Sequence, residues 1–309
     1  MMRIVSFFPK PLPQSIAEGL KETARIVYWS DLSDEERKDL SDVEIVISNP
    51  PVKMDKALLS FFPNLKMIAS LGVGFDKFDL NEMKHRGIVL TNAPSATSDD
   101  VADFAWALLT ALSRRTAQAW AHARKTHRTF SGFPLTDRIS GKRLGVAGLG
   151  HIGREIARRA EGFKMQIGYT NLSPCDVSYQ RFESLKELAA WCDYLVLAMP
   201  GGAATYHIAN EEIFEALGPK GYLINIGRGE LIDTEALIRA LESKTIAGAA
   251  IDVFEGEPAI DERLTRLDNL LITPHIASGT YEARESAGEQ ALDNIRAFLA
   301  TGDAPNRVV

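Results

Sequence analysis

Three side chains in the second half of the sequence have the chemistry to move a proton and to bind a small anion. They are Arg228, Glu257 and His275. A histidine exchanges a proton near neutral pH, a carboxylate can fix its tautomer and raise its pKa, and an arginine can bind a carboxylate or polarise a carbonyl. Each follows an apolar run typical of a buried strand: Tyr222–Ile226, Ala247–Val253 and Leu270–Thr273. Since parallel strands end at one edge of a sheet, we expect the three to share that edge.

A glycine-rich segment near the middle of the chain predicts a dinucleotide-binding turn. It follows the apolar run Arg143–Ala147 and opens the helical pattern Arg154–Gly162, which is the context that this motif requires. Its glycines allow a tight turn, close approach to a pyrophosphate and close packing of helix on strand. The predicted cofactor-binding residues of the turn are Gly148, Gly150, His151, Ile152 and Gly153.

The end of the next predicted strand bears on which dinucleotide is bound. An acid at this point would hold the ribose diol of NAD, but the sequence has Thr170 and Asn171 there and no acid before Asp176. Neutral side chains remove repulsion against a 2′-phosphate, so we expect these two residues to bind NADP(H) in preference. NAD(H) stays possible because the turn has no arginine.

Short apolar runs alternate with amphipathic segments along the whole chain, a pattern typical of βαβ units. Five strands are predicted in the first part: Arg3–Phe7, Arg25–Tyr28, Glu44–Ser48, Leu65–Leu71 and Ile88–Thr91. Six are predicted in the second: the four runs given above, Gln166–Tyr169 and Tyr194–Met199. One long helix from Val101 to about Lys125 is predicted to link two domains, and a last helix, Tyr281–Ala300, to return to the first domain.

Composition narrows the class of protein. The 309 residues carry 41 acidic and 35 basic side chains, a net charge of −6 that does not suggest a nucleic acid or an anionic membrane as partner. Two cysteines exclude a disulfide scaffold and a cysteine-based zinc site, and we expect no metal. The apolar N-terminal segment is too short for a signal peptide or a membrane span, so the expected location is cytoplasmic. The composition therefore leaves two classes of protein, an enzyme or a ligand-binding protein, and does not choose between them.

Taken together, the motifs resemble the D-isomer-specific 2-hydroxyacid dehydrogenases. The resemblance covers nearly the whole chain: it includes Leu71–Asp76, Asp100–Ala102, Gly141–Lys142, the glycine turn and the segments around Arg228, Glu257 and His275. It implies an α/β fold with two doubly wound parallel-sheet domains. A Rossmann nucleotide domain, residues 98–281, is then inserted in a flavodoxin-like substrate domain, residues 1–97 and 282–309.

The resemblance also implies a role for each site residue. His275 is the general acid in reduction, Glu257 orients it, and Arg228 binds and polarises a 2-oxo acid. Glu257 is preferred to Glu255 because the family's functional acid directly precedes a proline. The backbone amides of Val73 and Gly74 bind the substrate carboxylate. Further positions that line the cofactor are Pro200, Ile226, Gly227, Asp252 and Ser278, and the less favoured alternative for Asp252 is a helix cap or a solvated acid.

Within the family, the neutral turn at Thr170 and Asn171 resembles that of NADPH-dependent glyoxylate and hydroxypyruvate reductases. Leu172 departs from the arginine that many of them carry, and bulkier 2-oxo acids such as phenylpyruvate remain an alternative. A non-catalytic, dinucleotide-sensing scaffold is an alternative of another class. The resemblance also implies a homodimer, for which we identify five positions that could equally pack in the core: Phe104, Trp106, Leu108, Leu109 and Trp120.

Overall fold

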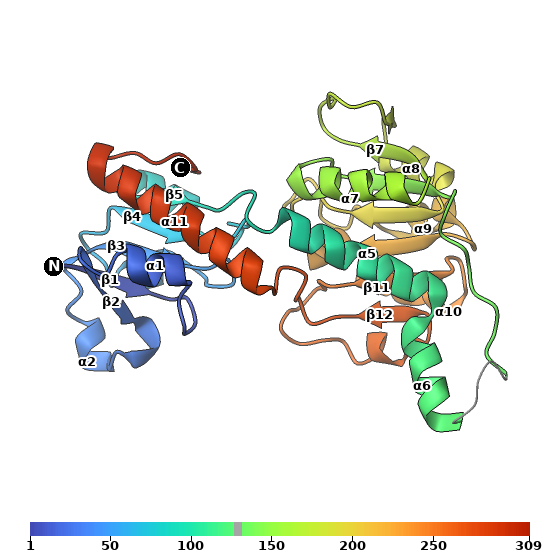
Figure 1. Ribbon diagram of the computed structural model, residues 1–309, viewed down its shortest axis with the longest axis horizontal. Helices are drawn as coiled ribbons and strands as arrows, with labels where there is room; N and C mark the ends of the chain where they lie inside the picture. The colour runs from blue at the N-terminus through green and yellow to red at the C-terminus, as the bar shows by residue number, and fades with distance from the viewer. Residues whose placement is uncertain (127–131) are drawn as a thin grey trace. The chain divides into compact units, whose positions relative to one another are not determined.

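The computed structural model describes residues 1–126 and 132–309, which form two compact units (Figure 1). One unit combines Met1–Thr97 with Gly279–Val309, and the other is Ser98–Ser278. The sequence placed the second boundary three residues later. Thr280 explains the difference, because its side chain caps the final helix by accepting a hydrogen bond from the Ala283 N–H, so the loop before that helix belongs with it.

The first unit is built on a five-stranded parallel sheet. Its strands occur in the order β2-β1-β3-β4-β5, the doubly wound order of flavodoxin-like folds. Ligands of such sheets bind beyond the carboxyl ends of the strands. The strands are β1 (Met2–Ser6), β2 (Ala24–Tyr28), β3 (Val43–Ser48), β4 (Met67–Ser70) and β5 (Val89–Thr91).

Helices cover both faces of this sheet and bury two separate apolar clusters. One face carries α1 (Gln14–Gly19) and α11 (Tyr281–Thr301), and the other carries α2 (Asp34–Arg37), α3 (Lys56–Leu59) and α4 (Leu80–Arg86). Alternate residues of one strand point to opposite clusters, as Ile4 and Val5 do. Helix α4 ends at Gly87, which adopts the left-handed conformation with φ 67°.

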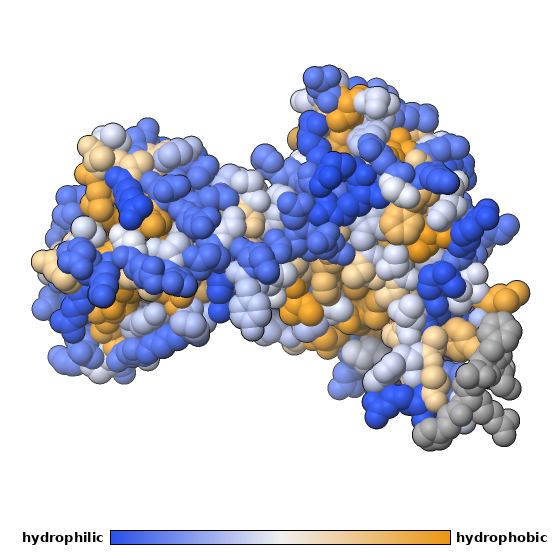
Figure 2. All heavy atoms as spheres, in the orientation of Figure 1, coloured by the Kyte–Doolittle hydropathy of each residue, from blue (hydrophilic) through white to orange (hydrophobic). Residues whose placement is uncertain are grey.

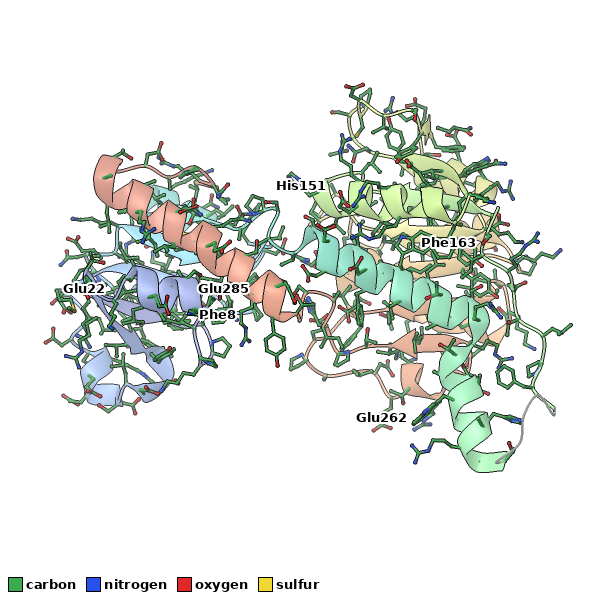
Figure 3. The ribbon with its side chains drawn as sticks, in the orientation of Figure 1. Phe8, Glu22, His151, Phe163, Glu262 and Glu285 are labelled. Carbon is green, nitrogen blue, oxygen red and sulfur yellow. The ribbon has the colours of Figure 1, made fainter. Side chains whose placement is uncertain are left out.

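The end of the chain completes this first unit. Glu285 of α11 accepts hydrogen bonds from the first amides of α1, Gln14 N–H at 2.9 Å and Ser15 N–H at 2.7 Å (Figure 3). The residues after α11 then lie along β5, where Arg307 forms an antiparallel bridge with Thr91. The first and last parts of the sequence therefore fold together as one compact unit.

The second unit is built on a seven-stranded parallel sheet in the order β12-β11-β10-β9-β6-β7-β8. Read from β8, this is the Rossmann order, with the topological switch between β6 and β9. The strands are β6 (Arg143–Ala147), β7 (Gln166–Thr170), β8 (Gln180–Arg181), β9 (Tyr194–Leu197), β10 (Tyr222–Asn225), β11 (Gly248–Ile251) and β12 (Leu270–Ile272). The sequence predicted six of them. It missed β8 because two polar residues show no alternation or apolar run.

Helices also cover both faces of the second sheet. One face carries α5 (Ser98–Arg114) and α7 (His151–Gly162), and the other carries α8 (Leu185–Trp191), α9 (Glu211–Leu217) and α10 (Thr234–Glu242).

Single 3₁₀ turns occur in both units, at Trp29–Asp31, Gly229–Leu231 and Leu264–Arg266. None of the helices in residues 1–126 and 132–309 is long and apolar enough to cross a membrane.

The single long helix predicted from Val101 to Lys125 is wrong. Arg115 has a left-handed backbone, φ 50°, and divides the segment into α5 and α6 (Thr116–Thr126). The reason lies in packing: α5 buries one apolar face along its length, whereas α6 buries no residue. Moreover, α5 belongs wholly to the second unit, so the chain crosses between units just before this helix.

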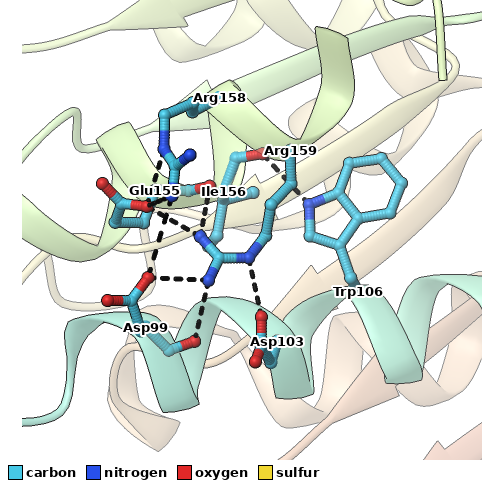
Figure 4. A network of polar contacts seen from close by, with 7 residues as sticks. All are labelled: Asp99, Asp103, Trp106, Glu155, Ile156, Arg158 and Arg159. Atoms are coloured by element: carbon cyan, nitrogen blue, oxygen red, sulfur yellow. Dashed lines mark hydrogen bonds and ion pairs between the residues drawn. The ribbon is translucent and has the colours of Figure 1, made fainter. Parts of the chain in front are cut away.

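Charged side chains fasten the start of α5 to α7 (Figure 4). Arg159 binds Asp99 and Asp103 of α5, at 2.7 Å each, and Glu155 of its own helix at 2.8 Å. One turn further along α5, the Trp106 indole donates to the Ile156 carbonyl at 3.0 Å. The surface over α7 is correspondingly hydrophilic (Figure 2). A partly buried arginine with several carboxylate partners is worth more than one exposed ion pair, so the first turn of the second unit is well fixed.

Candidate active site

The carboxyl edge of the second sheet collects the chemistry-bearing residues. The glycine turn follows β6, Arg228 follows β10, Glu257 follows β11 and His275 follows β12. All these strands are parallel, so their ends open on the same side of the sheet. This is the edge at which doubly wound sheets bind their ligands.

Glu257 and His275 form a hydrogen-bonded pair. The Glu257 Oε2 atom lies 2.7 Å from Nδ1 of His275, and its Oε1 atom accepts from the Phe254 N–H at 3.1 Å. The hydrogen bond to Glu257, reinforced by the carboxylate charge, raises the pKa of His275 above its ordinary value, although burial works in the opposite direction. With Nδ1 engaged, Nε2 is the ring nitrogen that can give its proton to a ligand.

Asp252 holds the loop that carries His275. Its carboxylate accepts three hydrogen bonds: from Thr273 Oγ1 at 2.6 Å, from Ile276 N–H at 3.0 Å and from Ala277 N–H at 2.8 Å. Its backbone carbonyl accepts from the His275 N–H at 2.9 Å. His275 has a left-handed backbone, φ 54°, which costs free energy in a residue other than glycine. These bonds stabilise that strained conformation.

The position of Asp252 differs from both alternatives that the sequence left open. Its side chain is only 1% exposed, so it is not a solvated acid, and its bonds reach a following loop rather than a helix start. It is a positioning residue for His275. Its direct contact with a cofactor stays a prediction, as does that of Ser278, which is exposed at the end of the same loop.

A buried asparagine that the sequence analysis missed fixes the Arg228 turn. Asn225, the last residue of β10, is fully buried; its Nδ2 donates to the Arg228 carbonyl at 2.8 Å, and its Oδ1 accepts from the Gly227 N–H at 3.1 Å. The Arg228 guanidinium donates to the Gly227 carbonyl at 2.8 Å. Its charge also acts on His275, whose pKa it lowers, so the two cationic groups are near each other. A polar residue ending an apolar strand is the signal that could have revealed Asn225.

A second histidine–glutamate pair lies at the same edge. His207 Nε2 is 2.7 Å from Glu255, whose other oxygen accepts from the Thr234 hydroxyl at 2.5 Å. Burial opposes ionisation of Glu255, but these hydrogen bonds outweigh it and lower the carboxyl pKa. The structure thus pairs Glu257, not Glu255, with His275. His207 has no sequence signal beyond its residue type, because its partner lies 48 positions away.

The glycine turn has the shape that a pyrophosphate requires. Gly148 has φ 94°, and a Cβ atom there would lie 2.8 Å from the Met199 nitrogen. A Cβ on Gly153 would lie 2.1 Å from the Gly148 carbonyl, so helix and strand approach too closely for a side chain. Gly150 precedes α7 without a side-chain cap, and the amides of the first helical turn therefore stay available to an anion (Figure 3, where His151 marks this end).

The end of β7 braces the glycine turn. The Thr170 carbonyl accepts from the Gly148 N–H at 3.0 Å, and Asn171 Oδ1 accepts from the Leu149 N–H at 3.3 Å. The Asn171 Nδ2 atom donates to the Ser173 carbonyl at 3.2 Å, so both ends of this amide already have protein partners. Leu172 is fully exposed. No acid follows β7 directly, as the sequence indicates. The Asn171 amide, however, is already engaged by the protein and is not free to bind NADP(H) as we expected.

Four other predicted cofactor positions have different surroundings. Pro200 is exposed after β9, whereas Ile226 and Gly227 are buried after β10. A Cβ atom on Gly227 would lie 2.7 Å from the Met199 carbonyl, which explains the glycine by packing between neighbouring strands. Ile152 is half-buried in the first turn of α7. Cofactor contact by these residues stays a prediction.

In the first unit, Val73 and Gly74 lie in the loop after β4. Gly72 packs against Pro50, which a Cβ atom would meet at 2.5 Å. Neither the Val73 nor the Gly74 N–H donates a hydrogen bond to a residue that the structure describes. Two such amides in one loop are suited to an anion.

Comparison with known proteins decides the family. The family model described as D-isomer specific 2-hydroxyacid dehydrogenase, NAD binding domain, matches residues 106–277. The chain belongs to this family. A glyoxylate/hydroxypyruvate reductase A of Arabidopsis thaliana is 40% identical over 262 residues, 84% of this chain and 83% of that protein. A hydroxyphenylpyruvate reductase of Plectranthus scutellarioides is 39% identical over 276 residues, 88% of each chain.

A solved structure has the same fold over the length of this dehydrogenase. An NADPH-dependent glyoxylate/hydroxypyruvate reductase from Sinorhizobium meliloti, in complex with NADP and malonate, superposes with a TM-score of 0.89 at 35% identity, covering 99% of this chain and 96% of that one. The predicted α/β class with a Rossmann unit is therefore confirmed.

As a member of this family, the dehydrogenase is an oxidoreductase that uses a nicotinamide dinucleotide. The open N-terminus of α7 and the close glycine packing fit the pyrophosphate of that cofactor. Within residues 1–126 and 132–309, no cluster of three or more His, Cys, Asp or Glu side chains is placed to hold a metal ion. The Glu257–His275 pair and Arg228 lie at the carboxyl edge of the second sheet, together with the His207–Glu255 pair.

Proposed function

We propose that this dehydrogenase reduces a small 2-oxo acid, glyoxylate or hydroxypyruvate, to the D-2-hydroxy acid with NADPH. The observation that carries the proposal is the Glu257–His275 pair, with Arg228 near it, at the ligand-binding edge of the Rossmann sheet. A proton donor and a fixed cation near one another suit a carbonyl that gains negative charge on reduction. The similar reductases from Arabidopsis thaliana and Sinorhizobium meliloti support the substrate class.

When bound, the cofactor supplies the hydride for C2 of the 2-oxo acid. In the proposed reaction, Nε2 of protonated His275 donates its proton to the carbonyl oxygen, while Glu257 holds Nδ1 and keeps the ring oriented. Arg228 stabilises the negative charge on that oxygen before the proton arrives. In the first unit, the amides of Val73 and Gly74 bind the substrate carboxylate.

The test is steady-state turnover with glyoxylate and hydroxypyruvate. His275→Ala should lower kcat by about 10²–10⁴, the usual contribution of a general acid, with the dissociation constant for NADPH unchanged. His85→Ala is a matched control, since this histidine lies exposed in the last turn of α4. Near-normal turnover by His275→Ala would refute the assignment. If the wild-type enzyme turned over no 2-oxo acid, the scaffold alternative would be favoured.

A bulkier 2-oxo acid is the second candidate. It is favoured by the hydroxyphenylpyruvate reductase from Plectranthus scutellarioides, whose identity to this chain nearly equals that of the Arabidopsis thaliana enzyme. Phe75, which is 37% exposed in the loop of Val73 and Gly74, offers an aromatic surface. Comparing kcat/KM for glyoxylate, hydroxypyruvate, phenylpyruvate and 4-hydroxyphenylpyruvate separates the two candidates.

The proposed preference for NADPH rests on the neutral turn after β7. No carboxylate there repels a 2′-phosphate, and the Sinorhizobium meliloti enzyme was solved with NADP. Asn171→Asp should lower the NADPH to NADH ratio of kcat/KM by about tenfold, equivalent to ~1.4 kcal/mol. Gln166→Glu places the same charge at the opposite end of β7 and should leave the ratio unchanged. A wild-type preference for NADH would overturn the proposal.

We further infer a homodimer. Of the five positions considered from sequence, three are buried in the core of the second unit: Trp106, Leu108 and Leu109. They pack in the core rather than at a subunit interface. Trp120 is 62% exposed on α6, the helix that buries no residue of its own chain. A subunit interface would cover this helix. The cytoplasmic location expected from the sequence stays a prediction.

A further inference from the structure

The loop that carries the Val73 and Gly74 amides is held by its carbonyl groups. The Ala93 N–H donates to the Gly72 carbonyl at 2.9 Å, and the Asn92 Nδ2 atom donates to the Val73 carbonyl at 2.9 Å. In a trans peptide the C=O and the N–H of the next residue point in opposite directions. Anchoring both carbonyls on one segment therefore turns the N–H groups of Val73 and Gly74 away from it, toward a common side.

This orientation gives the two amides their binding capacity. Both lie on the side away from residues 92–93, and neither donates to a described residue. Successive N–H groups that point the same way form a concave site for an anion. If the Val73–Gly74 peptide were released and rotated, the Gly74 N–H would leave that side, and one of the two donors would be lost.

Asn92 is itself held by two other asparagines. Asn294, fully buried on α11, donates from Nδ2 to the Asn92 carbonyl at 3.2 Å. Its Oδ1 accepts from the backbone N–H of Asn306 at 3.2 Å and from that residue's Nδ2 at 3.3 Å. The Asn92 N–H in turn donates to the Asn306 carbonyl at 3.2 Å. Figure 1 shows the C-terminal segment beside β5 and α11, where these bonds are made.

These contacts link the end of the chain to the amides proposed to bind substrate. Buried amide groups are costly to leave without partners, so Asn92 keeps its orientation only while Asn294 and Asn306 are in place. We propose that Asn92 is a positioning residue for the carboxylate-binding amides of Val73 and Gly74, and that Asn294 and Asn306 extend this control to the C-terminal segment. The inference rests on the proposed function, because it concerns how that substrate is bound.

The test compares Asn92→Ala with Asn64→Ala. Asn64 Nδ2 donates the same kind of bond, to the Ser41 carbonyl at 2.8 Å, but before β4 rather than after it, at the opposite edge of the same sheet. Carboxylate binding acts on ground state and transition state alike, so Asn92→Ala should raise KM for glyoxylate about three- to tenfold with a smaller change in kcat. KM for NADPH should stay unchanged. Asn64→Ala should change neither KM.

Asn306→Ala keeps the inference testable if Asn92→Ala folds poorly. It removes one outer bond of the network and should raise KM for glyoxylate in the same direction by a smaller factor. Unchanged KM for glyoxylate in a folded Asn92→Ala enzyme, or equal rises in both KM values, would overturn the inference. An inactive wild-type enzyme would instead refute the proposed function. Calorimetric binding of oxalate, which cannot be reduced, then decides: weaker binding by Asn92→Ala than by wild type supports the inference, and equal or absent binding refutes it.

Discussion

Replacing Asp252 by asparagine tests how the His275 loop is held. The three hydrogen bonds to Asp252 are made in nearly complete burial, one from a hydroxyl and two from backbone amides. An asparagine of the same shape has only one oxygen. Its NH₂ group must face either the Ala277 N–H or the pair formed by the Thr273 hydroxyl and the Ile276 N–H. At least one bond to a charged acceptor is lost, at a cost of about 1.5–3 kcal/mol.

The effect should be visible in stability and in turnover separately. Urea unfolding of Asp252→Asn should give a free energy of unfolding lower than that of wild type by this amount. A displacement of His275 by about 1 Å can cost up to about 10²-fold in rate, so we expect kcat to fall by about ten- to a hundredfold. Asp193→Asn is the control, because Asp193 accepts from the Arg143 N–H at 2.8 Å at the amino edge of the same sheet.

The control should lose stability but keep its kcat. If Asp252→Asn were as stable as wild type, the three bonds would not have the strength assigned to them. If it were destabilised but fully active, the carboxylate would support the fold without positioning His275. Either result would refute the reasoning.

Three other predictions concern separate parts of the molecule. The raised pKa of His275 means that reduction should slow as pH rises through a value above the ordinary 6.5, and Glu257→Gln should move this decline to lower pH, as pH profiles of kcat will show. Gly153→Ala should weaken NADPH binding at least about tenfold in fluorescence titration, since its Cβ would collide with the Gly148 carbonyl; unchanged affinity would contradict this. Trp120→Asp should give monomers in light scattering, and a monomeric wild type would exclude the proposed dimer.

The order of elements could largely be predicted from the sequence because buried parallel strands are short apolar runs. Nine of the eleven predicted runs end within one residue of the observed strand, and those of β9 and β11 end two residues too late. The features that the sequence analysis missed depend on tertiary packing. Local sequence does not show that α6 lacks a core to pack on, or that Arg115 adopts a left-handed backbone between two helices.

The residues of the site also differ in whether the sequence could predict them. Arg228, Glu257 and His275 could be identified because parallel topology brings strand ends together, whatever the loops do in detail. The way in which neighbouring residues hold them could not be predicted. Asn225 and Asp252 act through hydrogen bonds to turns whose geometry exists only in the folded chain.

The split first unit has a consequence for folding during synthesis. Residues 1–97 form all five strands of their sheet, but the face around Ile4, Ile45 and Ile47 is covered in part by α11. Between the two segments the ribosome must make residues 98–278, which takes roughly 10–40 s at about 5–20 residues per second. During that interval the apolar face of the sheet is not covered by α11. The first segment is therefore the part of this chain that most needs protection from aggregation during synthesis.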